Sequence, residues 1–243
     1  MKRLLCLFLI CVTLAAQSSQ QALLFSQKIS AIETIAYDTS TDGGLVNPGT
    51  SLTWSHTVTG THPILWVGVF GDTVAGDATC AKITGVTYNS VSLTQVPTNS
   101  PVQTPGDRCA YLFYLAGPAT GAHNVVVSAS SSIVIAALAS SYTGVKQTGI
   151  PDSSNKNTVT GSTTGITTST TVVTNNSWIV LYGKATTAPS AGTGSTQRQT
   201  ANDAGLYDTN AAVSSGSQSM QITTGGVNAN IGVIMASFAP YGS

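Results

Sequence analysis

Side chains that commonly take part in catalysis are sparse in this sequence. Its histidines are His56, His62 and His123, and a zinc or copper site would require all three to converge from separate strands and turns. His56 alternates with Trp54 and Val58, a pattern that predicts a histidine packed in the core. Serine is abundant, but the strained Gly-x-Ser-x-Gly turn that exposes a nucleophilic serine does not occur in the chain.

Carboxyl groups are also few, and among the nine acidic residues only Glu33 is a glutamate. Glycoside hydrolysis needs two carboxyls across a cleft, one of them kept in its acid form by burial. Asp203 and Asp208 are close enough in sequence to form such a pair, but Arg198 lies near both and predicts a structural ion pair. We therefore expect that the protein is not an enzyme.

One acidic segment has the spacing of a calcium loop. Asp38, Ser40 and Asp42 place an oxygen-bearing side chain at every second position, and Gly43 permits a turn after them. The position that would supply a bidentate glutamate is Gly49 instead. Two interpretations follow, a calcium site formed by these three side chains or an ordinary turn rich in Asp and Ser. No other cofactor is expected.

Aromatic side chains that could stack on a sugar ring divide into two groups. Trp54, Trp66 and Trp178 lie in segments typical of strands, which predicts that they pack in the core. Tyr207 lies in a polar segment and Tyr241 lies near the C-terminal end, so we expect these two rings to be exposed. Tyr207 and Tyr241 are therefore the candidate ligand-binding residues.

The N-terminal residues have the pattern of a signal peptide. Two basic residues precede an unbroken apolar run over residues 4–14, and small or polar residues follow it. The run is too short to span a hydrocarbon layer of about 30 Å as a helix. We expect residues 1–18 to be removed, with cleavage after Ala16 or Ser18. The protein is then secreted or held at the cell surface, without a membrane span.

The four cysteines are divided between the signal peptide and the remaining chain. Removal of the signal peptide leaves Cys80 and Cys109 in an oxidising compartment. Two exported cysteines most simply form a disulfide, since a zinc site needs four ligands at tight spacing. This bond would close a loop of about thirty residues and, on the chain-entropy account, stabilise the fold by about 3.5 kcal/mol.

Charge is low throughout the chain. Charged residues make up 7% of the sequence, against about 25% in ordinary globular domains, and the formal net charge is +0. The surface must therefore be built largely from hydroxyls and amides. A chain without a basic face is not expected to bind nucleic acid.

The residues above must be positioned by strands, because helix signals are almost absent. Residues 52–58 alternate between apolar and polar side chains, as in a half-buried strand, and residues 64–70 are almost continuously apolar, as in a central strand. Asn89-Ser90 predicts a two-residue hairpin turn. Further strands are expected over residues 83–88, 91–96, 110–115, 124–129, 133–142, 178–182, 217–223 and 231–238.

These short strands predict an all-β fold, an antiparallel two-sheet β-sandwich with jelly-roll-like connections. We expect one domain over residues 19–243, with an N-terminal extension to about residue 50. The Thr-rich stretch over residues 155–176 is expected to be a long connection that contains an edge strand.

Four segments together resemble a β-sandwich module found in secreted bacterial proteins and in phage virion proteins. They are residues 86–94, 111–127, 141–148 and 232–238. The resemblance covers roughly Leu52 to Pro240 and implies a jelly-roll-like protein with a surface or adhesive role. The module usually has glycine where this chain has Ser90, a departure that affects the hairpin turn.

These observations favour a secreted, non-catalytic structural or adhesive surface protein whose partner is a second copy of itself. The alternative is a carbohydrate-binding module that recognises an extracellular polysaccharide. Self-association would indicate the first function, and saturable glycan binding that depends on Tyr207 would indicate the second.

Overall fold

The structure is a computed structural model that describes residues 31–72, 80–96, 102–104, 108–161, 164–226 and 230–243. A compact unit that spans Glu33–Tyr241 holds every strand of this described part. The signal peptide expected over residues 1–18 lies outside the described residues.

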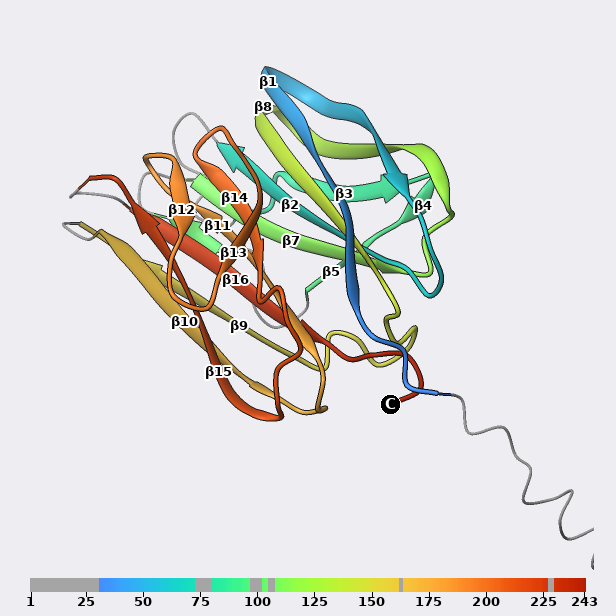
Figure 1. Ribbon diagram of the computed structural model, residues 1–243. Helices are drawn as coiled ribbons and strands as arrows, with labels where there is room; N and C mark the ends of the chain where they lie inside the picture. The colour runs from blue at the N-terminus through green and yellow to red at the C-terminus, as the bar shows by residue number, and fades with distance from the viewer. Residues whose placement is uncertain (1–30, 73–79, 97–101, 105–107, 162–163, 227–229) are drawn as a thin grey trace, which may run out of the picture. The chain divides into compact units, whose positions relative to one another are not determined.

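The first sheet has eight strands, all paired in antiparallel fashion (Figure 1). They are β1 (Ala36–Val58), β2 (Ile64–Asp72), β3 (Ile83–Tyr88), β4 (Val91–Ser92), β5 (Thr94–Gln95), β6 (Val102–Thr104), β7 (Arg108–Ala116) and β8 (Gly121–Thr143). Their order is β4-β3-β8-β2-β7-β5, while β1 pairs with β8 and β6 pairs with β7.

The remaining strands form a five-stranded and a three-stranded sheet. The five-stranded sheet has the order β13 (Thr196–Ala201), β14 (Ala204–Asp208), β11 (Trp178–Lys184), β16 (Ile231–Phe238) and β9 (Ser153–Val159). The three-stranded sheet has the order β10 (Gly165–Val172), β15 (Gly216–Thr224) and β12 (Pro189–Ala191). The predicted all-β antiparallel sandwich is confirmed, and its strands fall into three sheets.

The central strands are buried on both faces because each contributes to two cores. In β2, Ile64 and Trp66 pack into a core shared with the five-stranded sheet. The alternate residues Leu65, Val67 and Val69 pack into a second core inside the first sheet. Strands β11 and β16 likewise supply the shared core and a third core against the three-stranded sheet. Continuous apolar sequence in these strands follows from this double burial.

The first and five-stranded sheets approach closely where Gly68 of β2 meets Tyr182 of β11. A Cβ atom on Gly68 would lie 2.1 Å from Tyr182 Cδ2, so a larger residue would displace the ring. Trp66 and Trp178 fill the same core and are 0% and 7% exposed. The prediction that these two tryptophans pack inside is confirmed.

Strands β1 and β8 pair along most of their length and form a ribbon, which we call the folded ribbon. The N-terminal half of β1, residues 36–46, pairs with the C-terminal half of β8, and residues 51–58 pair with the N-terminal half. Register shifts around Gly49 separate the two halves of β1. Residues 36–50, which the sequence placed in an extension, thus belong mostly to a paired strand.

The other local predictions agree with the structure in part. The strand expected over residues 91–96 is divided into β4 and β5, and the connection expected over residues 155–176 contains β10 and most of β9. Strands β12, β13 and β14 were not predicted. The two strands expected over residues 124–129 and 133–142 are joined into the single strand β8. The predicted turn between β3 and β4 is confirmed, since Asn89 and Ser90 have φ values of 48° and 64°. Ser90 therefore adopts the left-handed conformation without the freedom of a glycine.

Candidate functional site

A chain of hydrogen-bonded side chains links the two halves of the folded ribbon, and we call it the polar relay. Trp54 Nε1 donates to Thr41 Oγ1 at 3.0 Å, and Thr41 Oγ1 lies 2.8 Å from His56 Nδ1. His56 Nε2 lies 3.2 Å from Ser141 Oγ, which donates to Asp38 Oδ2 at 2.7 Å. The relay therefore connects residues 38–41 in the N-terminal half of β1 with residues 54–56 in its C-terminal half, through side chains that include Ser141 of β8.

The relay has one consistent direction of proton donation. Because the Trp54 indole is only a donor, Thr41 accepts its proton and turns its own proton toward His56 Nδ1. His56 then carries its hydrogen on Nε2 and donates it to Ser141. Every member is satisfied when the imidazole is neutral and Asp38 is ionised.

The electrostatics of the relay agree with this protonation pattern. Burial lowers the pKa of His56 to about 4, although the negative charge of Asp38 opposes the shift. Burial acts to raise the pKa of Asp38, but hydrogen bonds from Thr59 and Ser141 outweigh it and leave that pKa below its ordinary value. The relay therefore contains a neutral base and an anion that is stabilised by donors.

The relay contains the residue types of a hydrolase triad but connects them in a different way. In a triad the histidine accepts the proton of the serine and is oriented by the acid. Here Ser141 donates its proton directly to Asp38, and His56 donates to Ser141. His56 and Ser141 are 1% and 0% exposed, so a substrate has no access to the hydroxyl. This geometry holds the folded ribbon together and does not activate a nucleophile.

A buried ion pair lies between β13 and β14 of the five-stranded sheet, and its arginine also contacts β1. Arg198 Nε lies 2.6 Å from Asp208 Oδ2, and Asp208 is 0% exposed. The guanidinium carbon of Arg198 lies 4.2 Å from the ring centre of Tyr37, and Ser40 Oγ donates to the Arg198 carbonyl oxygen at 2.9 Å. The predicted structural role of Arg198 is confirmed, whereas Asp203 belongs to a separate ion pair.

Lys184 is a buried cation that the sequence analysis did not single out. Its Nζ donates to the carbonyl oxygens of Ala185 and Asn202 at 2.9 and 3.0 Å, and it lies 4.5 Å from the ring centre of Phe70. Burial lowers the pKa of Lys184 to about 8, although Asp203, 3.7 Å away, opposes the shift. The hydrogen bond from Lys184 to Asn202 fixes the turn between β13 and β14. Its burial could have been suspected from the sequence, because Lys184 ends the largely apolar strand β11.

The three predicted calcium ligands lie in β1 and not in a separate loop. A short turn held by the Asp42 side chain interrupts the strand register between Asp42 and Leu45, which agrees with the interpretation as an ordinary turn. Asp38 belongs to the polar relay, and Ser40 bonds to Arg198. Asp42 Oδ1 accepts a bond from Gly44 N at 2.7 Å. Within the described ranges no group of three or more His, Cys, Asp or Glu side chains is placed to hold a metal ion. A calcium ion would have to displace the present donors.

The two candidate ligand-binding tyrosines differ in their surroundings. Tyr207 is 0% exposed, so the expectation that its ring is exposed is wrong. The reason is that β14 lies between β11 and β13, and Tyr207 packs into the core beneath them. Tyr241 is half-buried, and its ring stacks on His62 at a centroid distance of 3.4 Å. Glu33 Oε1 lies 2.8 Å from His62 Nδ1, and this contact helps to fix the imidazole that Tyr241 stacks on.

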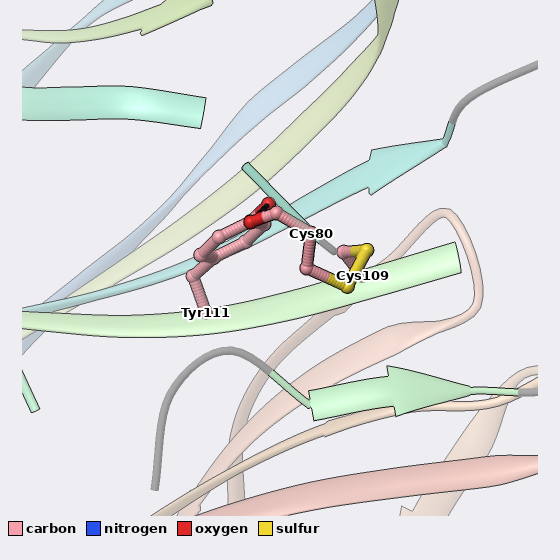
Figure 2. The surroundings of a disulfide bond; sticks show 3 residues. All are labelled: Cys80, Cys109 and Tyr111. Carbon is pink, nitrogen blue, oxygen red and sulfur yellow. Dashed lines mark hydrogen bonds between the residues drawn. A yellow bond between two sulfur atoms is a disulfide. The ribbon is translucent and has the colours of Figure 1, made fainter. Parts of the chain in front are cut away.

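The predicted disulfide between Cys80 and Cys109 is confirmed. Their Cα atoms are 5.5 Å apart, and 29 positions separate them in the sequence. Figure 2 shows the ring of Tyr111 directed at the backbone of Cys80, to whose carbonyl oxygen Tyr111 Oη donates at 2.6 Å. The disulfide fixes residue 80, just before β3, against β7.

The exposed strand faces carry rows of hydroxyl groups. The outward side chains of the C-terminal half of β1, the β1 row, are Ser51, Thr53, Ser55 and Thr57, and those of β10, the β10 row, are Thr167, Ser169 and Thr171. Both rows are exposed, and no Asp, Glu, Lys or Arg occurs between Asp42 and Asp72. The surface built from hydroxyls that composition predicts is present on these strands.

Comparison with known proteins gives no assignment for these features. The sequence matches no family model, and it matches no curated protein. The ectodomain of ANX2 from Arabidopsis thaliana is 9% identical, with 79% of this chain and 82% of that chain covered and a TM-score of 0.26. A cupin 2 conserved barrel domain protein from Leptotrichia buccalis is 8% identical, with 84% and 96% covered and a TM-score of 0.18.

These TM-scores are too low to support an argument about fold or function, so function must be argued from the chain's own residues. In the part that the structure describes, no helix has the length and apolar character needed to cross a membrane.

Proposed function

We propose that the chain is an exported, non-catalytic surface protein with a structural or adhesive role. The observation that carries the proposal is the contrast between its inside and its outside. The serine and histidine of the polar relay are buried, and together with the half-buried Asp38 they are bonded so as to hold the folded ribbon. The exposed strands present uncharged rows of hydroxyls instead.

Two features support export. The N-terminal residues have the charge and apolar pattern of a signal peptide. The disulfide between Cys80 and Cys109 suits an oxidising compartment. The resemblance to a module of secreted bacterial proteins and phage virion proteins points to a surface role, and the leader favours the secreted group.

A carbohydrate-binding module is the second candidate, and Tyr241 is the observation that favours it. Its half-buried ring lies flat on His62, which is a platform of the kind on which a sugar ring stacks. Tyr207 does not contribute to this alternative because its ring is buried.

Biolayer interferometry on the oxidised mature chain separates the two candidates. The immobilised protein is exposed to the same protein in solution and, separately, to soluble polysaccharides. We expect concentration-dependent binding of the protein to itself and no saturable binding of a polysaccharide. Saturable polysaccharide binding that Tyr241→Ala removes would replace the proposal with the glycan-binding function. Absence of binding to either would overturn both.

A further inference from the structure

We propose that residues 51–58 of β1 form an edge that pairs, antiparallel, with the same residues of a second copy of this chain. The proposal rests on the structural role proposed above and assigns a surface to it. The partner is a second copy because antiparallel pairing of this segment with itself matches its alternating hydroxyl and inward residues and brings no like charges together. The observations that carry it concern how the strand edges of this protein are covered.

The C-terminal half of β1 is a paired strand on one side only. Residues 51–58 pair continuously with β8, without a register shift, and no other described strand pairs with β1. The N-terminal half of β1 is covered differently, because Ser40 and Tyr37 contact Arg198 of β13. Beyond the C-terminal end of β1, the backbone nitrogen of Thr59 is bonded again, because it donates to Asp38 Oδ2 at 2.9 Å. Between these points the described residues leave one row of backbone groups without a strand beside it.

Two other long edges of the described sheets are covered or irregular. Side chains of β9 cover the edge of β10, since Asn155 Nδ2 donates to Ser169 O at 2.7 Å and Asn157 Nδ2 donates to Thr167 O at 2.9 Å. Strand β13 carries a register shift between Gln197 and Gln199. Both are recognised ways of preventing edge-to-edge pairing.

The edge over residues 51–58 lacks the usual protective features. It has no charged residue, no proline and no bulge, and its side chains alternate regularly between outward hydroxyls and inward apolar or ring side chains. An edge of this kind is a template for pairing with another strand. The segment carries no Asp, Glu, Lys or Arg, and burial lowers the pKa of His56 to about 4, so two copies meet near neutral pH without charge repulsion.

Antiparallel pairing about a two-fold axis preserves both faces of the strand. With the axis at Trp54 or at Ser55, odd-numbered residues face odd-numbered residues of the partner, so hydroxyls lie beside hydroxyls. On the inward face, Trp54 lies opposite the partner's Trp54 when the axis is at Trp54, and opposite the partner's His56 when the axis is at Ser55. The result is a continuous sheet in the order β3-β8-β1-β1-β8-β3, and the half-buried Trp54 ring gains cover.

The experiment measures the mass of the oxidised mature chain by light scattering during size exclusion, over a wide range of concentration. Ser55→Lys places two ammonium groups at or beside the axis, where like charges oppose pairing. Ser169→Lys is the matched control, since Ser169 is an exposed serine at the middle of β10. We expect a dimer for the parent chain and the control. Ser55→Lys should raise the dissociation constant by about tenfold or more.

A second variant tests the register and does not depend on the effect of the lysine. Ser55→Cys should form an intermolecular disulfide under mild oxidation, whereas Ser169→Cys should not, and circular dichroism checks that each variant is folded. A parent dimer that Ser55→Lys leaves intact and that Ser55→Cys does not cross-link would overturn this inference while the structural role stands. A monomer at every concentration would also overturn it. If that monomer adheres to a surface, the proposed adhesive role stands without the pairing of residues 51–58. If it does not adhere, both the pairing and the proposed role are refuted.

Discussion

His56 should make the protein less stable in acid. Burial lowers its pKa from 6.5 to about 4 in the folded chain, against the opposing charge of Asp38. Between these values the unfolded chain binds more protons than the folded one, so the free energy of unfolding falls as the pH falls. From about pH 7 to about pH 4 the loss is about 3 kcal/mol, at about 1.4 kcal/mol per pH unit across the window. Below about pH 4 His56 adds no further loss.

Asp38 acts in the same direction at lower pH. Its folded pKa lies below the ordinary value of 3.8, because hydrogen bonds from Thr59 and Ser141 outweigh the effect of burial. The stability that it contributes is complete above the ordinary pKa and is lost as the pH falls through the folded pKa. The ring of Tyr88, 6.5 Å from that of His56, is neutral throughout this range and does not change the sign.

The assay is urea unfolding followed by tryptophan fluorescence at several pH values between about 7 and 4. His56→Gln keeps a donor and an acceptor in the relay but does not titrate, so its loss of stability over this range should be about 3 kcal/mol smaller. His123→Gln removes the imidazole at the paired position of β8 and should retain the loss seen in the parent chain. If the parent chain and His56→Gln lose the same free energy, the neutral buried imidazole is refuted.

Three further results are expected. Lys184 has a folded pKa of about 8, so the unfolded chain binds more protons above that pH, and stability should rise by about 2 kcal/mol from about pH 8 to about pH 10. Urea unfolding at those pH values should show this rise in the parent chain and not in Lys184→Met. Replacing both Cys80 and Cys109 by alanine should lower the free energy of unfolding by about 3.5 kcal/mol, and an unchanged urea midpoint would contradict the loop-closure argument. Asp208→Ala leaves Arg198 unpaired and largely buried, so thermal unfolding should show a loss of about 3–5 kcal/mol, whereas a loss below about 1 kcal/mol would mean that solvent screens the pair.

The parts of the fold that could be predicted are those that local pattern determines. Double burial of β2 requires apolar residues at consecutive positions, and the sequence over residues 64–70 shows them directly. The left-handed turn at Asn89-Ser90 follows from the tolerance of asparagine for that conformation. The bend of the folded ribbon could not be predicted, because the register shifts around Gly49 depend on contacts with β8 that are distant in sequence.

The site could be predicted only in part for the same reason. The pairing of Cys80 with Cys109 follows from their number and compartment alone. The polar relay unites Asp38, His56 and Ser141, and no local spacing connects these three residues. Tyr207 was placed wrongly because its polar neighbours are satisfied inside the fold, Asp208 by its ion pair with Arg198.

The buried polar groups of this chain share one physical task, which bears on its function. Backbone ladders join strands within a sheet, but strands of different sheets or of different halves of the ribbon need side chains to join them. The polar relay joins the two halves of the ribbon. Arg198 of β13 contacts Tyr37 and Ser40 of β1, and Lys184 of β11 lies over the ring of Phe70 of β2. Asparagines of β9 do the same at the edge of β10. The few charged residues that this chain buries lie at contacts between strands, and residues 51–58 contain no Asp, Glu, Lys or Arg. That distribution is consistent with the proposed pairing of two copies along residues 51–58.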